Sequence, residues 1–213
     1  MIKNIIFDLD GLLADTERLH IKSYVQAFTD HNIELTPQKY QEHWIRNGLG
    51  VKEYIAQFNL PYTVEELHNH KHQIFLEYAK TDLLPMPFAK ELLELVKNDF
   101  RLFVASNSYM KNVKMVLSQL DMLDYFEALA ARETVPNLKP APDIYLYLAE
   151  GYNFNPDETV VLEDAQKGID AAYAAGMKSI AVPTQYTSDN DFSKADAIVN
   201  SLEDVTIVIL KKL

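Results

Sequence analysis

Short apolar runs that alternate with amphipathic helical segments most constrain the fold of this 213-residue chain. The runs are rich in β-branched and aromatic residues and lie at 2–7, Leu102–Ala105, Thr159–Leu162, Ser179–Val182 and Ala197–Val199. Helical patterns lie at Phe88–Lys97, Tyr109–Leu120, Pro142–Gly151, Ala165–Ala175 and Leu202–Leu210. Short apolar strands that are each followed by a helix imply right-handed crossovers and a parallel sheet covered on both faces. The sequence therefore predicts an α/β fold.

One long block interrupts this alternation after the first apolar run. Residues 16–82 show helical periodicity with little strand signal, and the predicted helices cover 16–29, 37–45, 51–58 and 64–80. We predict that this block is an inserted helical cap. The predicted domains are a core formed by 1–14 and 86–213 and a helical cap domain formed by 15–85.

The composition limits the partners of the chain. It has 20 basic and 31 acidic residues, a formal net charge of −11, no cysteine and no Lys/Arg-rich tract. Such a chain repels nucleic acid, and the absence of cysteine excludes disulfides and thiolate sites. No apolar stretch approaches the roughly 20 residues of a membrane span. We expect a cytoplasmic protein, a monomer or weak dimer, that takes a small ligand and binds neither nucleic acid nor membrane.

Polar residues follow the predicted strands where a ligand is expected. In an open parallel sheet, ligands bind beyond the carboxyl ends of the strands. The residues at these ends, with one lysine before a helix, are Asp8, Asp10, Gly11, Ser106, Asn107, Ser108, Lys139, Glu163 and Asp164. Carboxylates, hydroxyls and one ammonium group should therefore meet at one edge of the sheet.

This set suits the transfer of a phosphoryl group. The Asp8 carboxylate can attack phosphorus, and Asp10, two residues on, can protonate the leaving oxygen and then deprotonate a water molecule. Mg²⁺ prefers oxygen ligands, which Asp8, Asp164 and the Asp10 carbonyl can supply, with Glu163 beside them. A small phosphorylated metabolite is the expected substrate.

The remaining polar groups of the set have matching roles. Ser106 and the amide of Asn107 can donate hydrogen bonds to phosphate oxygens, and Lys139 adds positive charge. Each signal alone has a structural explanation, such as a turn, a helix cap or a solvated lysine. Their occurrence together at successive strand ends favours a site.

Two groups of residues in the helical block are predicted to have structural rather than functional roles. Of His68, His70 and His72, only His68 and His72 share a helix face, and we predict a solvated face rather than a metal site. Trp44 with Tyr40 and Tyr54 is predicted to form part of the core of the cap.

Four motifs carry a resemblance to the haloacid dehalogenase-like hydrolase superfamily, in its phosphatase and β-phosphoglucomutase-like branch. They are Phe7-Asp8-Leu9-Asp10-Gly11, Phe103-Val104-Ala105-Ser106-Asn107, Lys139-Pro140-Ala141-Pro142-Asp143 and Leu162-Glu163-Asp164. The resemblance implies a Rossmann-like core with a helical cap, an aspartyl-phosphate intermediate on Asp8 and dependence on Mg²⁺. True dehalogenases lack the second aspartate of the first motif, so Asp10 argues against carbon–halogen cleavage.

The resemblance also extends into the cap. His20 is similar to a histidine of the first cap helix, and a loop with Gly48, Leu49 and Lys52 resembles the substrate-specificity loop. Mutases of this branch carry an arginine where this chain has Val51, although Arg46 or Lys52 can substitute for it. We therefore predict a phosphatase, with a β-phosphoglucomutase-like sugar phosphomutase or a non-catalytic phosphate- or metal-binding module as alternatives.

Overall fold

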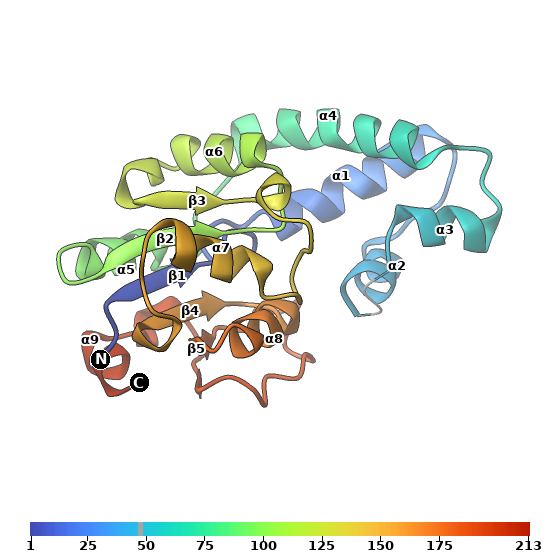
Figure 1. Ribbon diagram of the computed structural model, residues 1–213. Coiled ribbons are helices and arrows are strands. Elements are labelled where there is room, and N and C mark those ends of the chain that lie inside the picture. The colour runs from blue at the N-terminus through green and yellow to red at the C-terminus, as the bar shows by residue number, and fades with distance from the viewer. Residues whose placement is uncertain (47–48) are drawn as a thin grey trace. The chain divides into compact units, whose positions relative to one another are not determined.

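A single parallel sheet organises the computed structural model, which describes residues 1–46 and 49–213 (Figure 1). Within these residues the sheet has six strands in the order β3-β2-β1-β4-β5-β6. The strands are β1 (Asn4–Phe7), β2 (Arg101–Ala105), β3 (Ala128–Ala130), β4 (Thr159–Glu163), β5 (Lys178–Ala181) and β6 (Ala197–Ile198). All neighbouring pairs are parallel, which confirms the predicted α/β class.

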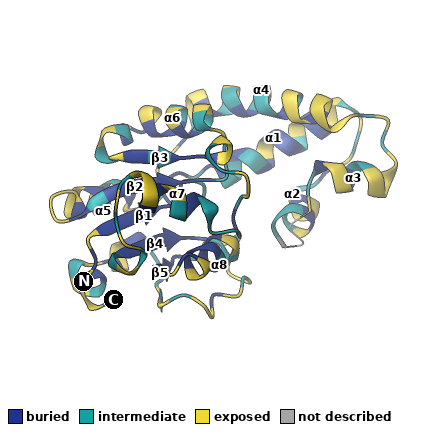
Figure 2. Ribbon diagram, in the orientation of Figure 1, coloured by how far each residue is buried: buried dark blue, intermediate teal, exposed yellow. Residues whose placement is uncertain are grey.

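The central strands explain why the apolar runs are continuous. Every residue of β1 and β4 is buried, because both faces of a parallel sheet are covered (Figure 2). Phe7 pairs with Val104 of β2 on one side and with Leu162 of β4 on the other. The three strands therefore end almost level, and the residues that follow them are brought to one edge.

The helices that accompany the sheet follow the predicted segments with shorter bounds. They are α5 (Ala89–Val96), α6 (Met110–Gln119), α7 (Asp143–Gly151), α8 (Gln166–Ala174) and α9 (Ile207–Lys212), with short 3₁₀ turns η2 (Leu123–Tyr125), η3 (Arg132–Thr134), η4 (Pro156–Glu158) and η5 (Leu202–Asp204). Apolar residues of α7 and α8 form one buried cluster with β1–β4 side chains such as Ile6, Phe103 and Val161. Gly176, with a φ of 71°, follows α8, as its position after the alanine-rich segment predicts.

The structure corrects two predictions for these elements. Strand β3 was not predicted, because its three residues include two alanines and give little apolar signal. The single helix expected over Leu202–Leu210 is wrong. Ser201 does cap a turn with Asp204, but that turn ends at Val205, and Thr206 caps the separate helix α9 by accepting a hydrogen bond from the Ile209 N–H.

The chain divides into two compact units. Unit 1 is Met1–Asp15 with Leu84–Leu213, and unit 2 is Thr16–Leu83. Unit 2 consists of α1 (Glu17–Asp30), α2 (Pro37–Tyr40), the π-helical turn η1 (Gln41–Arg46), α3 (Val51–Phe58) and α4 (Val64–Asp82). The assignment of the units to a catalytic core and a cap stays a prediction.

Aromatic rings fill the interior of unit 2. Trp44 stacks on Tyr40 with ring centroids 5.0 Å apart, and it lies 5.1 Å from both Tyr24 and Tyr54. Phe28 meets Tyr54 edge to face at 5.3 Å. Such offset and edge-on contacts add to the burial of apolar area. Tyr40 and Tyr54 are buried, which confirms them as core residues, whereas Trp44 is half-buried in contact with both.

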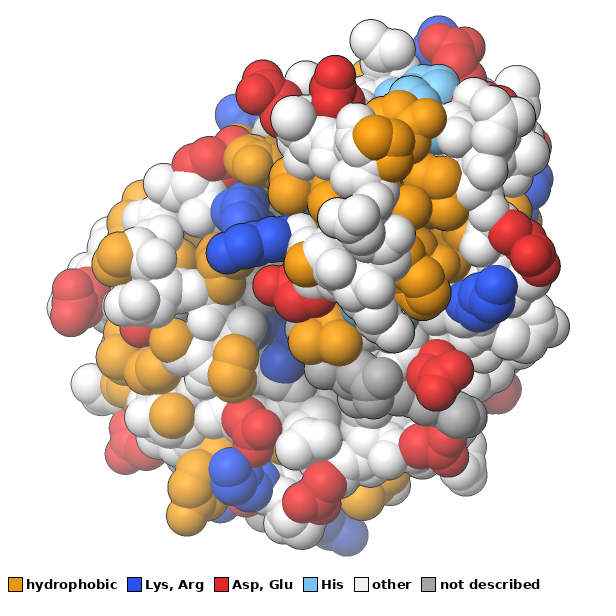
Figure 3. Space-filling model, turned by 90° about the vertical axis from the view of Figure 1, so that its right-hand side faces the viewer, with side chains coloured by type: hydrophobic (Ala, Val, Ile, Leu, Met, Phe, Trp, Pro, Cys, Tyr) orange, Lys and Arg blue, Asp and Glu red, His pale blue; other side chains and the backbone are white. Residues whose placement is uncertain are grey.

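Two surface properties bear on partners. None of the helices described is both long enough and apolar enough to cross a membrane. On the face drawn in Figure 3, Lys and Arg side chains occur in small groups among Asp, Glu and hydrophobic side chains. That face offers no continuous basic surface for a polyanion.

Candidate active site

Two aspartates follow β1 at the edge where the central strands end. Asp8 is buried, and its N–H donates to the Leu162 carbonyl oxygen at 3.0 Å, which continues the ladder between β1 and β4. Asp10 lies at the start of a tight turn in which the Gly11 N–H donates to the Ala14 carbonyl oxygen at 2.9 Å. Gly11 has a φ of 87°, so a residue with a side chain is strained there. The turn fixes both aspartates on a rigid backbone.

A buried lysine bridges two of the carboxylates. Lys139 Nζ lies 2.7 Å from Asp8 Oδ1 and 2.7 Å from Glu163 Oε1, and it donates to the Ala105 carbonyl oxygen at 2.8 Å. The Tyr145 ring lies beneath the ammonium group, 5.0 Å away. Lys139 comes directly before a cis peptide bond to Pro140. Three oxygens and an aromatic face thus hold this ammonium group between β1, β2 and β4.

Burial and like charge set the protonation of Asp8. Desolvation is the largest effect and the nearby Glu163 carboxylate adds to it, while the Lys139 ammonium opposes both. Together they raise the pKa of Asp8 from 3.8 to about 7. The pKa of Lys139 is instead raised well above its ordinary value, because the Asp8 and Glu163 carboxylates outweigh its desolvation. Lys139 therefore stays charged at neutral pH.

Glu163 and Asp164 complete a cluster of carboxylates. Single oxygens of Asp8, Glu163 and Asp164 all lie within 4.8 Å of one another, and all three residues are buried. Glu163 Oε2 also accepts a hydrogen bond from the Ala165 N–H at 3.1 Å. Three buried carboxylates with one neighbouring ammonium group leave an excess of negative charge, which a divalent cation with oxygen preference would compensate.

Glycines allow the backbone to approach these carboxylates closely. A Cβ atom on Gly168 would lie 1.7 Å from Glu163 Oε1, and a Cβ on Gly11 would lie 2.6 Å from Asp164 Oδ2. Both distances are shorter than atomic radii allow, so only glycine fits at either position. These glycines set the space in which the carboxylates are held.

Hydroxyl groups after β2 hold Asp10. Ser106 Oγ and Ser108 Oγ donate to Asp10 Oδ2 at 3.1 and 2.7 Å. The Ser108 N–H in turn donates to Ser106 Oγ at 2.9 Å. These bonds keep the Asp10 carboxyl group beside the edge of the sheet.

The side chain of Asn107 links two segments of the chain. Its side-chain amide donates to the Lys139 carbonyl oxygen at 3.2 Å and accepts from the Lys139 N–H at 3.1 Å. This pair of bonds ties the segment after β2 to the loop that carries Lys139. The predicted roles of Ser106, Asn107 and Lys139 in binding phosphate stay predictions.

Sequence reasoning missed two residues at this edge. Tyr145 is fully buried on α7, where an apolar helix pattern makes it look like an ordinary core residue. Arg132 follows the unpredicted strand β3, and its N–H donates to the Ser108 carbonyl oxygen at 2.9 Å. Its guanidinium group lies 5.4 Å from the centre of the Tyr109 ring. Recognition of β3 in the sequence would have drawn attention to Arg132.

The other predicted residues lie in unit 2. The His20 ring stacks on Phe75 with centroids 4.5 Å apart, and its Nδ1 lies 2.6 Å from Nζ of the buried Lys71. Leu49 is exposed, and Lys52 is exposed in the first turn of α3. Gly48 and the side chain of Arg46 lie outside the described residues. The structure thus places a histidine–lysine pair in this unit that the sequence did not predict.

Comparison with known proteins identifies the family. The family model for haloacid dehalogenase-like hydrolases matches residues 5–182. The chain is 32% identical to a Thermotoga maritima protein named phosphorylated carbohydrates phosphatase, over 83% of this chain and 82% of that protein. It is similar to the crystal structure of CbbY from Rhodobacter sphaeroides in complex with phosphate, with a TM-score of 0.85, 29% identity and coverage of 99% and 100%. It is also similar to β-phosphoglucomutase from Clostridium difficile, with a TM-score of 0.81, 27% identity and coverage of 100% and 96%. The chain belongs to the haloacid dehalogenase-like hydrolase family.

Proposed function

We propose that this protein is a Mg²⁺-dependent phosphatase of sugar phosphates or similar small phosphorylated metabolites, with Asp8 as the nucleophile. A single observation carries the proposal: Lys139 bridges Asp8 and Glu163 beside Asp164, at the strand edge where two serines hold Asp10. A phosphatase in this family also agrees with the Thermotoga maritima relative, which is named as a phosphatase of carbohydrates.

The proposed reaction has two displacements at phosphorus. First, an Asp8 carboxylate oxygen bonds to phosphorus, the ester P–O bond breaks, and Asp10 gives its proton to the leaving alkoxide. Then Asp10 takes a proton from a water molecule whose oxygen bonds to phosphorus, and the bond from phosphorus to Asp8 breaks. Inorganic phosphate leaves, and the Asp8 carboxylate and protonated Asp10 are restored.

The carboxylate cluster fits a divalent cation. Asp8 and Asp164 would hold Mg²⁺ with the Asp10 carbonyl, and Glu163 would lie beside it, since both Glu163 oxygens already accept hydrogen bonds. When bound there, Mg²⁺ supplies the positive charge that neutralises phosphoryl oxygens. The same charge favours the ionised form of Asp8, which nucleophilic attack requires.

Ser106, Asn107 and Lys139 are the proposed ligands of the transferring phosphoryl group. Ser106 is fully buried and its hydroxyl hydrogen-bonds Asp10, which supports a position for Ser106 next to the transferring phosphoryl group. Lys139 keeps its charge and reaches Asp8 directly. Phosphoryl transfer depends mainly on such positioning and charge.

Substrate choice is proposed to involve unit 2 as a cap. His20, Gly48, Leu49 and Lys52 are the proposed selecting residues. At the rim of unit 1, Arg132 offers a guanidinium group for a polar or anionic part of the metabolite.

A phosphomutase is the second candidate, supported by the similarity to β-phosphoglucomutase. A mutase retains a bisphosphate intermediate, and an arginine is the side chain best suited to hold its second phosphate. Val51 occupies the corresponding position and is buried in the first turn of α3, with 2% of its surface exposed. That buried apolar side chain favours hydrolysis over mutase activity.

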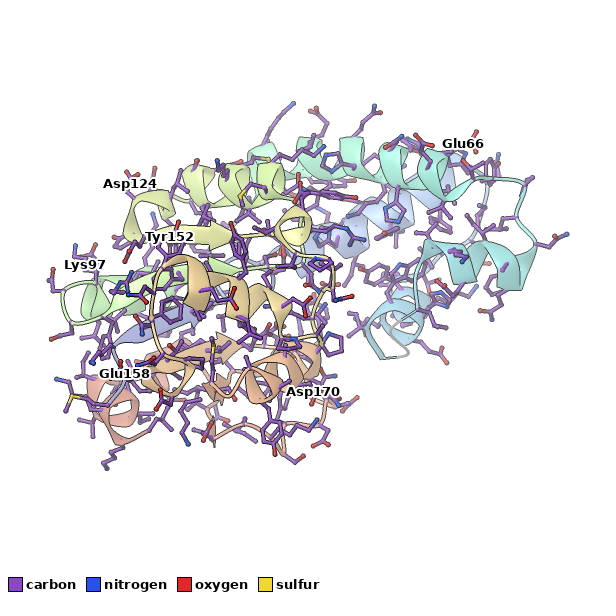
Figure 4. All side chains as sticks on the ribbon, in the orientation of Figure 1. Glu66, Lys97, Asp124, Tyr152, Glu158 and Asp170 are labelled. Carbon is purple, nitrogen blue, oxygen red and sulfur yellow. The ribbon has the colours of Figure 1, made fainter. Side chains whose placement is uncertain are left out.

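The test is phosphate release from a panel of sugar, nucleotide and small-acid phosphates, with Mg²⁺ and with EDTA. Asp8→Asn is compared with the control Asp170→Asn, because Asp170 of α8 forms an ion pair with Lys194 at 2.6 Å and is not one of the clustered carboxylates (Figure 4). We expect metal-dependent release that Asp8→Asn abolishes and Asp170→Asn retains. Conversion of β-glucose 1-phosphate to glucose 6-phosphate without release would establish the mutase instead. No turnover of any substrate would contradict both.

A further inference from the structure

Two histidine rings from different helices meet in unit 2. His31 ends α1, and His70 lies in the second turn of α4. His31 Nε2 and His70 Nδ1 are 3.2 Å apart, and the ring planes are nearly perpendicular at 87°. In the neutral pair, one nitrogen donates its N–H to the lone pair of the other. Two potential metal ligands thus already face each other.

The groups around the pair fix both rings. His70 Nε2 lies 3.3 Å from Asp30 Oδ2, so the proton of His70 is favoured on Nε2 and the Nδ1 lone pair is turned toward His31. The Tyr62 ring packs against His31 with centroids 4.4 Å apart, and its hydroxyl donates to the His31 carbonyl oxygen at 3.1 Å. A carboxylate behind a histidine in this manner is the usual outer partner of a metal-bound imidazole.

The distance between the nitrogens matches a metal site. Zinc–nitrogen bonds of about 2.0–2.1 Å in a tetrahedron separate two nitrogens by about 3.3–3.4 Å. The observed 3.2 Å differs from this by little, so a rotation of the rings suffices. We propose that His31 Nε2 and His70 Nδ1 bind a borderline transition-metal ion such as Zn²⁺, with Asp30 orienting His70.

The surroundings are negative, which favours a cation. Glu66 lies in the first turn of α4, one turn before His70 and therefore on the same face (Figure 4). Hydrogen bonds from Thr63 lower the pKa of Glu66, and the interaction with His31 lowers it further. Among the described residues, three metal-binding side chains converge only at Asp8, Glu163 and Asp164, and not at the histidine pair. The histidine site therefore supplies two direct protein ligands, and water completes the coordination.

This site differs in chemistry from the carboxylate cluster of unit 1. Imidazole nitrogens suit Zn²⁺, Ni²⁺ and Cu²⁺, whereas Mg²⁺ takes oxygen ligands. Metal on His31 and His70 joins the end of α1 to the start of α4, so it stabilises unit 2 by mass action. The proposal is independent of whether the protein is a phosphatase.

The test is calorimetric titration of the full-length protein with ZnCl₂ in several millimolar MgCl₂. We expect one zinc ion per chain whose affinity falls at least tenfold in His31→Asn and in His70→Asn. His72→Asn is the matched control, because it removes a histidine from the same helix without removing either ligand, and we expect a change below threefold. Asp30→Asn keeps both ligands and should weaken zinc binding about tenfold.

A second measurement uses the unaltered protein, so that misfolding of a variant cannot decide the result. Long-range ¹H–¹⁵N spectra with added zinc should shift His31 Nε2 and His70 Nδ1 most strongly. The proposal is overturned if His31→Asn and His70→Asn bind zinc as the wild type does. It is equally overturned if the largest shifts fall on His68 or His72.

Discussion

Each unit of the molecule contains a buried lysine, and the two lysines contact different kinds of side chain. In unit 1, Lys139 is 5% exposed and contacts two carboxylates at 2.7 Å. In unit 2, Lys71 is 8% exposed, and its Nζ lies 2.6 Å from His20 Nδ1 and 4.8 and 5.0 Å from the Tyr24 and Phe75 rings. Two carboxylates share the ammonium group of Lys139, whereas an imidazole nitrogen and two aromatic rings contact that of Lys71.

The two lysines also differ in the neighbouring groups that would lose a partner if either lysine were replaced. Without Lys139, two buried carboxylates would face each other with no cation between them, and a lone buried charge is far more costly than a lone buried dipole. Without Lys71, the Tyr24 and Phe75 rings would lose cation–π contacts, and His20 Nδ1 would lose a hydrogen-bond partner. A buried lysine among acids is therefore expected to be needed for both charge balance and chemistry.

The largest expected effect is the loss of turnover when the acid beside Lys139 is neutralised. Asp8→Asn keeps the shape of the side chain but removes the attacking oxygen, and we expect phosphate release to fall by more than about 1,000-fold. Initial rates with Mg²⁺ and the best substrate of the panel measure this. A rate within tenfold of the wild type would remove Asp8 from the role of nucleophile.

A matched pair of lysine substitutions sharpens the comparison directly. Lys139→Met should lower the free energy of unfolding by about 3–5 kcal/mol, because Asp8 and Glu163 lose their shared cation. Lys71→Met should lower it by about 1–2 kcal/mol, since methionine replaces the aliphatic stem while the cation–π contacts with Tyr24 and Phe75 are lost. Urea unfolding in EDTA at neutral pH measures both. Equal losses would show that the two environments are energetically alike.

A pair of glycine substitutions tests how tightly the carboxylate cluster is enclosed. Gly168→Ala should destabilise the protein by roughly 2–3 kcal/mol, because the new Cβ would overlap Glu163. Gly151→Ala is the control, since no atom lies within 4 Å of its Cβ position at the end of α7. We expect that control to be neutral or to stabilise by about 0.4–1 kcal/mol. Thermal unfolding of both variants gives the comparison.

A pH dependence of stability caused by Asp8 is a further expected effect, smaller than the loss expected for Lys139→Met. Its pKa is about 7 in the folded protein against an ordinary 3.8, so the folded state binds more protons between these values. Stability should therefore fall as pH rises from about 4 to about 7 in metal-free protein, by roughly 1–3 kcal/mol. Asp8→Asn removes this contribution. Urea midpoints at pH 5 and pH 8 in EDTA check it, and parallel profiles for the two proteins would contradict it.

The sequence predicts unit 1 better than unit 2 for a physical reason. Parallel strands end at a common edge, so the position of Asp8, Ser106 and Glu163 along the chain also gives their position in space. The structure brings these residues together at that edge. Strand β3 was not predicted because two of its three residues are alanine, and Arg132, which follows this strand, was therefore missed as well.

Helical periodicity carries less information about polar contacts. It assigned His70 to a solvated face, because a single helix does not show which residue of another helix lies opposite, and His31 comes from α1. Lys71 counts as polar in the same pattern, although aromatic rings of α1 and α4 cover it. Tyr145 was missed because the apolar pattern of its helix predicts only a core position, although its ring also contacts the Lys139 ammonium group.

The central place of β1 in the sheet has a consequence for synthesis of the protein. Asn4 of β1 pairs with Arg101 of β2 and with Thr159 of β4, and all of unit 2 is translated between β1 and β2. Strand β1 leaves the ribosome before both of its partners and therefore waits for them, while the continuous helices of unit 2 can pack first. During that interval, an apolar segment ending in Asp8 is the part of the nascent chain most in need of protection from aggregation.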